Sequence, residues 1–252
     1  LNSIPNRDDI QIIVVDDCSS DSCVSELKNN IEKNYPFVTF IYLTSNGGGG
    51  KARNEGLKYA KGNWLLFADA DDFFSENFLF LVDKYKDSDA DIVYFGVDNV
   101  SSDNPAIKMS QRLVNAEKVK SYLADGDESV LRYMFTEPWS KMIRKELVDE
   151  NSIRFSETMV CNDYYFSAVI GYHAKKIYAD EIVLYVVTQR ESSVSSRTET
   201  SSKLLDRINV TTTVLSYLRS HGLNLSEKYC VEKIDMLMIS LLKTDFFLGI
   251  KQ

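Results

Sequence analysis

The chain has 252 residues, a formal net charge of −8 at pH 7 and 44% hydrophobic residues. This length suits one large domain, or one domain with an appendage, and the apolar content is enough for a sizeable core. The negative charge argues against a general nucleic-acid binder, because the sequence has no basic stripe that could neutralise a phosphate backbone.

The first part of the chain alternates predicted strands with predicted helices. Four apolar runs predict strands and three intervening segments predict helices, in the order 10–15 (strand), 24–33 (helix), 37–43 (strand), 51–61 (helix), 64–68 (strand), 75–86 (helix) and 91–97 (strand). This alternation is typical of βαβ units. We therefore expect an α/β fold with a mixed, mostly parallel sheet.

After Val100 the pattern changes. A polar loop is expected at 101–105, followed by 116–123 (helix), 128–135 (helix), 141–144 (strand), 163–172 (helix) and 182–187 (strand). From Ser201 onward the apolar residues follow helical spacing. We expect this C-terminal part to be a helical appendage, packed on the domain or on a second copy of the chain.

The segment 64–72 is the most informative part of the chain, because an apolar run there ends in three carboxylates. The run predicts a strand that is buried on both faces. Asp69, Asp71 and Asp72 then offer several hard oxygens at one point. Mg²⁺ and Mn²⁺ prefer such carboxylates together with substrate phosphate oxygens, and open α/β sheets bind ligands at this edge. The segment therefore predicts a divalent-metal and phosphate site.

Four motifs in a fixed order carry a family resemblance: 14–21 (VVDDCSSD), 46–57 (NGGGGKARNEGL), 68–72 (ADADD) and 161–166 (CNDYYF). Together they resemble the family 2 glycosyltransferases that build bacterial capsule, O-antigen and other surface polysaccharides. The resemblance implies a GT-A-like sheet flanked by helices. It also implies a nucleotide-binding half at 1–100, an acceptor half at 101–198 and a C-terminal helical region at 199–252.

The resemblance assigns several residues to a donor nucleotide. Asp17, together with Asp16, accepts from the uracil or ribose; the alternative is that both cap the next helix, although two acids are more than a cap needs. Arg53 faces the diphosphate, which suits a bidentate guanidinium; the alternative is a surface arginine. Residues 47–50 fit neither a dinucleotide-binding nor a P-loop pattern, and we interpret them as a flexible loop entering a helix.

The same resemblance divides metal binding and catalysis among four acids. Asp69 and Asp71 are expected at the nucleotide, and Asp71 and Asp72 at a Mn²⁺ or Mg²⁺ ion; which acid does which stays open. Asp163 is the expected catalytic base, which takes the proton of the acceptor hydroxyl in an inverting transfer. Its alternative role is an N-terminal helix cap. The family commonly has Glu before this Asp, whereas this chain has Asn162.

Three more residues match family segments near the acceptor. Trp139 and Lys141 form a Trp-x-Lys pair, and the face of a Trp can pack on a sugar ring; the alternative is a core Trp. Arg190 is expected to bind phosphate or to order a loop. His173 and His221 have no metal-ligand partners nearby and are interpreted as structural or solvent-facing. The four cysteines show no CxxC or zinc spacing, which favours a reduced, intracellular protein.

The resemblance implies a metal-dependent, inverting hexosyl- or N-acetylhexosaminyl-transferase that uses a UDP-sugar. The expected acceptor is a saccharide or lipid-linked saccharide in surface-polysaccharide synthesis. The family's first strand has no counterpart here, since residues 1–4 resemble the end of the helix that follows it. The alternative function is therefore a non-catalytic nucleotide-sugar-binding or assembly subunit. A sugar nucleotidyltransferase is disfavoured, because its Gly-rich loop with Arg and Lys is absent from the N-terminal region.

The sequence also shapes expectations about partners and location. It contains no signal peptide and no apolar run near the ~18 residues of a membrane span. We expect a cytoplasmic protein that makes peripheral contact with the inner face of the plasma membrane. The C-terminal helices are expected to support a homodimer.

Overall fold

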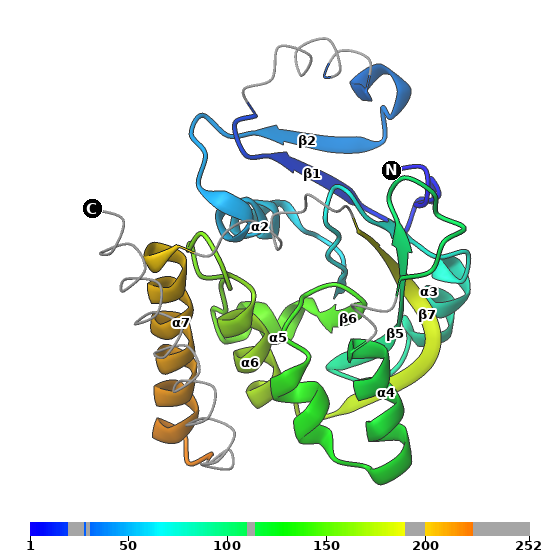
Figure 1. The fold of residues 1–252 in the computed structure, drawn as a ribbon. Helices are drawn as coiled ribbons and strands as arrows, with labels where there is room; N and C mark the ends of the chain where they lie inside the picture. Colours follow the sequence, from blue (N-terminus) through cyan, green and yellow to red (C-terminus); the bar gives the residue numbers. More distant parts are fainter. Residues whose placement is uncertain (20–27, 29–30, 110–113, 190–199, 224–252) are drawn as a thin grey trace.

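The computed structural model describes residues 1–19, 28, 31–109, 114–189 and 200–223. Figure 1 shows the path of the chain through a layered arrangement of strands and helices. The elements follow one another in the order β1 (Ile12–Asp16), β2 (Val38–Tyr42), α2 (Gly48–Tyr59), β3 (Trp64–Leu65), β4 (Phe73–Phe74), α3 (Phe78–Tyr85), β5 (Ile92–Ser101), α4 (Val114–Asp125), the π-helix η1 (Val130–Met134), β6 (Lys141–Arg144), α5 (Lys145–Glu150), α6 (Tyr164–His173), β7 (Ile177–Gln189) and α7 (Ser201–Ser220).

The described strands form two sheets. In one, β1 and β2 are parallel and Ile12 lies opposite Val38. The other has the order β3-β6-β5-β7-β4, in which β5 and β7 are parallel and the remaining neighbours are antiparallel. The mixed α/β fold is confirmed, with a larger antiparallel share than the sequence suggested. The reason is that β6 and β7, from the second half of the chain, separate the first-half strands β3, β5 and β4 from one another.

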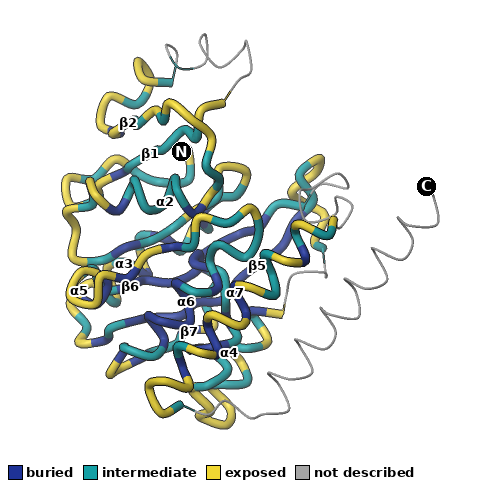
Figure 2. Tube along the Cα trace, turned by 90° about the vertical axis from the view of Figure 1, so that its left-hand side faces the viewer, coloured by how far each residue is buried: buried dark blue, intermediate teal, exposed yellow. Residues whose placement is uncertain are grey.

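The core is centred on the middle strands of the larger sheet. In β5 nearly every residue is buried, so both faces of the strand are covered. Figure 2 shows buried chain concentrated around β5, β6, β7 and α6, whereas β1 and β2 are mostly intermediate or exposed. Aromatic residues fill much of this centre, including Tyr94, Phe95, Phe135, Phe166 and Tyr185. The most buried part of the molecule is therefore the centre of the larger sheet together with α6.

The prediction of a doubly buried strand at 64–68 is wrong beyond its first two residues. Trp64 and Leu65 alone pair, with β6 and at the edge of the sheet. The chain then leaves the sheet, because Phe67 packs edge-on against Phe155 and Phe166 at centroid distances of 5.2 and 5.6 Å. The apolar run is thus used for aromatic packing, and this brings the acids after it toward the 155–166 region.

The glycine run is part of a helix. Helix α2 begins at Gly48, three residues before the expected start, so the interpretation of 47–50 as a flexible loop is wrong. A Cβ atom on Gly50 would lie 2.0 Å from the carbonyl oxygen of Ser156. Only glycine permits this approach of two backbones. The first turn of α2 is therefore packed closely against the segment that precedes α6.

Helix α7 packs on α6. A separate apolar cluster joins these two helices to η1 and consists of Tyr133, Tyr164, Ala168, Val210, Val214 and Leu218. His173 Nε2 lies 2.8 Å from Tyr217 Oη, so this histidine has the expected structural role. The helix predicted from Ser201 onward is present to Ser220, while its predicted continuation after residue 223 lies outside the described residues. No helix in the described ranges is both long enough and apolar enough to cross a membrane.

Candidate active site

Arg53 joins two segments that are far apart in the sequence. Its guanidinium donates to Asp69 Oδ1 at 2.6 Å and to Asn162 Oδ1 at 2.9 Å. The arginine side chain is 19% exposed, which makes these charge-assisted bonds stronger than they would be at the surface. The guanidinium of Arg53 therefore contacts both the acid-rich turn at 69–72 and Asn162, the residue before Asp163.

A second set of bonds from α2 holds the segment beneath this cation. The side chain of Asn54 donates to the carbonyl of Phe155 at 3.0 Å and accepts from its N–H at 2.8 Å. The ring of Phe155 lies under the guanidinium of Arg53, 5.5 Å from centroid to Cζ. Neighbouring residues on α2 thus fix the cation and the chain beside it.

Both acids after β1 have partners within the chain. The Asp17 carboxylate accepts from the backbone N–H groups of Gly47 and Gly48, at 2.9 and 2.5 Å. Asp16 accepts from the N–H of Ser19 and pairs with Lys28, both at 3.3 Å. Asp17 therefore stabilises the start of α2, where a negative charge is favourable. The capping alternative thus holds in part, although the capped helix is α2 and the cap comes from a distant segment.

The three acids of the 69–72 turn differ in their surroundings. Asp72 accepts from the N–H of Thr188 at 2.7 Å and from the hydroxyl of Tyr185 at 3.0 Å. Burial, reinforced by the charges of Asp71 and Asp69, raises the pKa of Asp72 to about 6 in spite of those two bonds. Asp71 is exposed, and its carboxylate accepts no hydrogen bond from the described residues. Asp72 therefore anchors the turn to β7, while Asp71 faces outward.

The metal-ligating chemistry of this turn is limited to a few oxygens. Within the described part of the chain, no three His, Cys, Asp or Glu side chains gather in a way that could enclose an ion. Mg²⁺ and Mn²⁺ do not need such a cage, because they are commonly held by one or two carboxylates and by substrate phosphates. The exposed carboxylate of Asp71, close in sequence to the cation-bound Asp69, fits that mode.

Asp163 lies at the N-terminal end of α6, but its side chain makes no capping hydrogen bond. Burial raises the pKa of Asp163 to about 6; the charges of Glu137 and Asp69 add to this, and Arg53 opposes it. These influences require all three charged groups to lie near the carboxylate. The carboxylate is therefore buried near Arg53 and makes no capping bond, while its place at the N-terminus of α6 agrees with the alternative of a charge favoured by the helix dipole.

The two residues of the Trp-x-Lys pair are buried. Trp139 is 3% exposed and stacks on Tyr185 at a centroid distance of 5.3 Å, which is the core alternative left open by the sequence. Lys141 is 1% exposed, and its ammonium donates to the carbonyl of Phe135 at 2.6 Å. In this structure neither side chain presents a face to an acceptor. Arg190 lies outside the described residues.

Several residues of the site had no signal in the sequence. Glu137 lies near Asp163 and accepts from the amide of Asn115 at 2.9 Å, and Tyr185 and Thr188 hold the acid turn. Each of them comes from an element distant in sequence, and none belongs to a motif. The identification of Tyr185 and Thr188 needed the pairing of β7 with β4 and β5, and that of Glu137 needed the packing of its segment beside Asp163; no local pattern reveals either.

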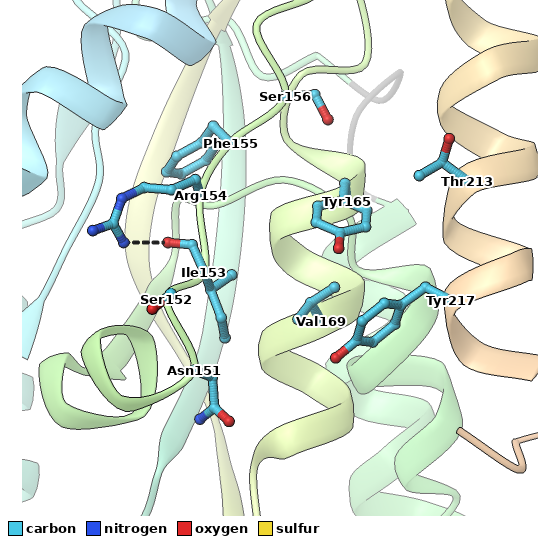
Figure 3. A pocket seen from close by; sticks show the side chains of 10 residues that line it. All are labelled: Asn151, Ser152, Ile153, Arg154, Phe155, Ser156, Tyr165, Val169, Thr213 and Tyr217. Carbon is cyan, nitrogen blue, oxygen red and sulfur yellow. Dashed lines mark hydrogen bonds between the residues drawn. The ribbon is translucent and has the colours of Figure 1, made fainter. Parts of the chain in front are cut away.

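A cavity of about 340 Å³ adjoins this region between the segment 151–156, α6 and α7. Figure 3 shows Tyr165 and Tyr217 on its helical side and Arg154 bonded to the carbonyl of Ile153 on the other. Phe155 belongs both to the lining of the cavity and to the packing under Arg53.

A family model described as glycosyl transferase family 2 matches residues 1–152, which is more than half of the chain. The chain belongs to this family. The resemblance inferred from the four motifs is thereby confirmed.

Curated relatives from three bacteria extend this result. The poly(ribitol-phosphate) beta-glucosyltransferase of Bacillus spizizenii is 31% identical over 180 residues, which are 70% of this chain and 27% of that protein. The Staphylococcus aureus poly(ribitol-phosphate) beta-N-acetylglucosaminyltransferase TarS is 31% identical over 202 residues, 76% of this chain and 33% of that protein. The cholesterol galactosyltransferase of Borreliella burgdorferi is 29% identical over 216 residues. The chain spans 27% to 60% of the length of these glycosyltransferases.

Solved structures show the same fold. The crystal structure of S. aureus TarS 1–349 in complex with UDP-GlcNAc has a TM-score of 0.62 and 23% identity, covering 94% of this chain and 64% of that chain. A mannosyltransferase from Pyrobaculum calidifontis, in complex with GDP-Man and Mn²⁺, has a TM-score of 0.51 and 15% identity, covering 92% and 60%. The expected GT-A-like fold of this family 2 glycosyltransferase is thereby confirmed.

Proposed function

We propose that this chain binds the donor and performs the transfer step of an inverting family 2 glycosyltransferase. In this proposal it moves a sugar from a UDP-sugar to a saccharide or lipid-linked acceptor during the synthesis of a cell-surface polymer. The observation that carries the proposal is the position of Arg53, which bonds both Asp69 and the neighbour of Asp163. The activities of the relatives from Bacillus spizizenii and Staphylococcus aureus support the substrate class.

The donor diphosphate is assigned to Arg53. A guanidinium has five N–H donors, and the bonds to Asp69 and Asn162 leave three of them for phosphate oxygens. Asp17 and Asp16 are assigned to the uracil or ribose, because a carboxylate oxygen that already accepts one hydrogen bond can accept another. Asp69 is assigned to the ribose. In this proposal the sugar end of the donor lies toward Asp163.

The metal is assigned to Asp71, with the donor phosphates as its other ligands. The sequence left this role open between Asp71 and Asp72, and Asp72 is the weaker candidate since burial disfavours its ionised form and raises its pKa, whereas Asp71 is exposed. The Mn²⁺ in the Pyrobaculum neighbour is consistent with this cofactor. When bound, the ion supplies charge that stabilises the departing nucleoside diphosphate.

Asp163 is assigned as the general base. Its carboxylate is not used as a helix cap, and a pKa of about 6 keeps it ionised at neutral pH while leaving it basic enough to accept a proton. It removes the proton of the acceptor hydroxyl as that oxygen attacks the anomeric carbon. A well-placed base of this kind accelerates a reaction by about 10²–10⁴-fold.

The test is transfer by the variant Asp163→Asn. We expect transfer to fall by about 10²–10⁴-fold, because the amide cannot accept the proton, while UDP affinity stays within about twofold. The measurements are product formation from UDP-glucose, UDP-galactose and UDP-GlcNAc, and calorimetric titration with UDP. Asp103→Asn, which changes an exposed carboxylate, is the matched control.

Two results would overturn this assignment. Full transfer by Asp163→Asn would remove the base from the mechanism. Tight binding of UDP by the unaltered chain, with neither transfer nor hydrolysis of any donor, would favour the alternative of a non-catalytic nucleotide-sugar-binding subunit.

A further inference from the structure

Lys141 is a buried cation that the proposed mechanism does not use. It lies on β6 and is 1% exposed, and its ammonium is flanked by the rings of Phe135 and Tyr94, at 4.6 and 5.2 Å from their centroids. Burial lowers the pKa of Lys141 to about 7, because a charged amine loses its hydration there. A buried lysine is costly for the fold, and side chains of this kind are often retained at functional sites for their charge.

The bonds of this ammonium lead to the helix that carries the base. Lys141 donates to the carbonyl of Phe135 at 2.6 Å and, more weakly, to the hydroxyl of Ser167 at 3.5 Å. Ser167 in turn donates its hydroxyl to the carbonyl of Thr136 at 2.5 Å and its N–H to the carbonyl of Asp163 at 2.9 Å. This chain of bonds ties the segment just before Glu137 to the first turn of α6.

The charges around Lys141 are those of the active site. Glu137 and Asp163 both favour its charged form, and Lys118 from α4 opposes it. A Coulombic interaction acts equally on both partners, so the ammonium also favours the ionised carboxylate of Asp163. Glu137, Arg53 and Asp69 act on this carboxylate more strongly than Lys141 does. Among the described residues, Lys141 and Arg53 are thus two cations that favour the ionised carboxylate of Asp163.

We propose that Lys141 is a positioning residue: its buried ammonium holds the first turn of α6 in place and keeps the carboxylate of Asp163 in its charged form. The inference rests on the proposed function, since it assigns a role relative to the base. It differs from the role at an acceptor sugar that the sequence suggested, because the ammonium lies beneath the site and not on its surface.

The pH profile of transfer tests this role. In Lys141→Met the side chain keeps most of its length but loses its charge, so the acid-side midpoint of kcat/KM should move upward by up to about 1 pH unit, with transfer at pH 6 up to about fivefold lower. Ser167→Ala keeps the charge and removes both bonds of the Ser167 hydroxyl, so it should lower kcat without moving the midpoint. Lys61→Met, at an exposed lysine, is the control and should match the unaltered chain.

The outcomes separate this inference from the proposed function. An unmoved midpoint in Lys141→Met overturns the positioning role, whatever the effect on thermal stability. Absence of transfer by the unaltered chain at every pH overturns the proposed function itself. If Lys141→Met does not fold, Lys141→Gln makes the same comparison, because it retains a donor for the carbonyl of Phe135 without the charge. UDP affinity should be unchanged in all these variants.

Discussion

At the residue scale, Arg53 has two acceptors that come from segments far apart in the sequence. Its planar fork serves Asp69 and Asn162 at once, and a lysine has no such geometry. We expect Arg53→Lys to weaken UDP binding by about tenfold, which corresponds to the loss of one charge-assisted hydrogen bond. Calorimetric titration with UDP measures this change.

The matched control for that substitution is Arg154→Lys. Arg154 is an exposed arginine of the neighbouring segment, and its guanidinium donates to the carbonyl of Ile153. Its replacement should leave UDP affinity unchanged. Equal losses in the two variants would mean that Arg53 has no special place at the diphosphate.

Ionisation of Asp163 should also make the free energy of unfolding depend on pH. Its pKa is about 6 in the fold and 3.8 without perturbation, so the fold penalises the ionised form. The cost of ionising Asp163 in the fold is therefore absent below pH 3.8 and complete above about pH 6. As a result, the free energy of unfolding decreases as the pH rises from 3.8 to about 6. We expect Asp163→Asn to be more stable than the unaltered chain at pH 7.5, by about 1–3 kcal/mol.

Denaturant unfolding at pH 7.5 and pH 4 tests this expectation. The advantage of Asp163→Asn should shrink toward zero at the lower pH, where the native carboxyl is also neutral. A variant that is less stable than the unaltered chain at pH 7.5 would show that the carboxylate is a structural ion pair or cap.

The sequence identified residues that belong to contiguous motifs, and it did not identify their partners. Asp69, Asp163 and Arg53 lie together as the family resemblance implied. Glu137 could not be found, because its relation to Asp163 depends on how two distant segments pack. The burial of Lys141 could not be predicted either, because a Trp-x-Lys sequence is the same whether the lysine faces the solvent or the core.

At the scale of elements, the start of α2 is the part most sensitive to a single atom. Gly50 lies so close to Ser156 that a Cβ would be 2.0 Å from a backbone oxygen. We expect Gly50→Ala to cost about 1–3 kcal/mol of stability through displacement of the helix. It should also weaken UDP binding, because Arg53 is carried on the next turn of that helix.

Gly56→Ala in the same helix provides the control. The nearest atom to its added Cβ, Val15 Cγ2, lies at the ordinary distance of 3.4 Å. Because alanine favours helix more than glycine, this variant should be neutral or more stable by up to about 1 kcal/mol. Thermal unfolding of both variants distinguishes the cases, and a similar loss in each would mean that the close approach at Gly50 is unimportant.

Local sequence patterns predicted whether a segment forms a helix or a strand better than they predicted what that segment packs against. The strand at 141–144 has the predicted bounds, and the helix predicted at 163–172 is shifted by one residue. The run at 64–68 has the composition of a buried strand, yet only two of its residues pair. The apolar composition predicts that Phe67 is buried. Whether it is covered as part of a sheet strand or by packing against the ring of Phe155 depends on tertiary contacts.

At the scale of the whole molecule, the order of strands in the larger sheet creates the site. Because β7 lies between β5 and β4, the side chains of Tyr185 and Thr188 reach Asp72 and fix the acid turn. The alternation of strands and helices predicted the α/β class. It could not predict this order, because sheet neighbours are set by contacts across the full length of the chain.

The central claim is that Arg53 gathers the acid turn and Asp163 around a metal-bound nucleoside diphosphate. A crystal structure of the chain with UDP and Mn²⁺, with anomalous scattering to locate manganese, tests it most directly. We predict a manganese peak about 2.0–2.2 Å from Asp71, with the diphosphate in contact with both the ion and Arg53. UDP bound elsewhere, or a nucleotide without manganese near Asp71, would contradict the account.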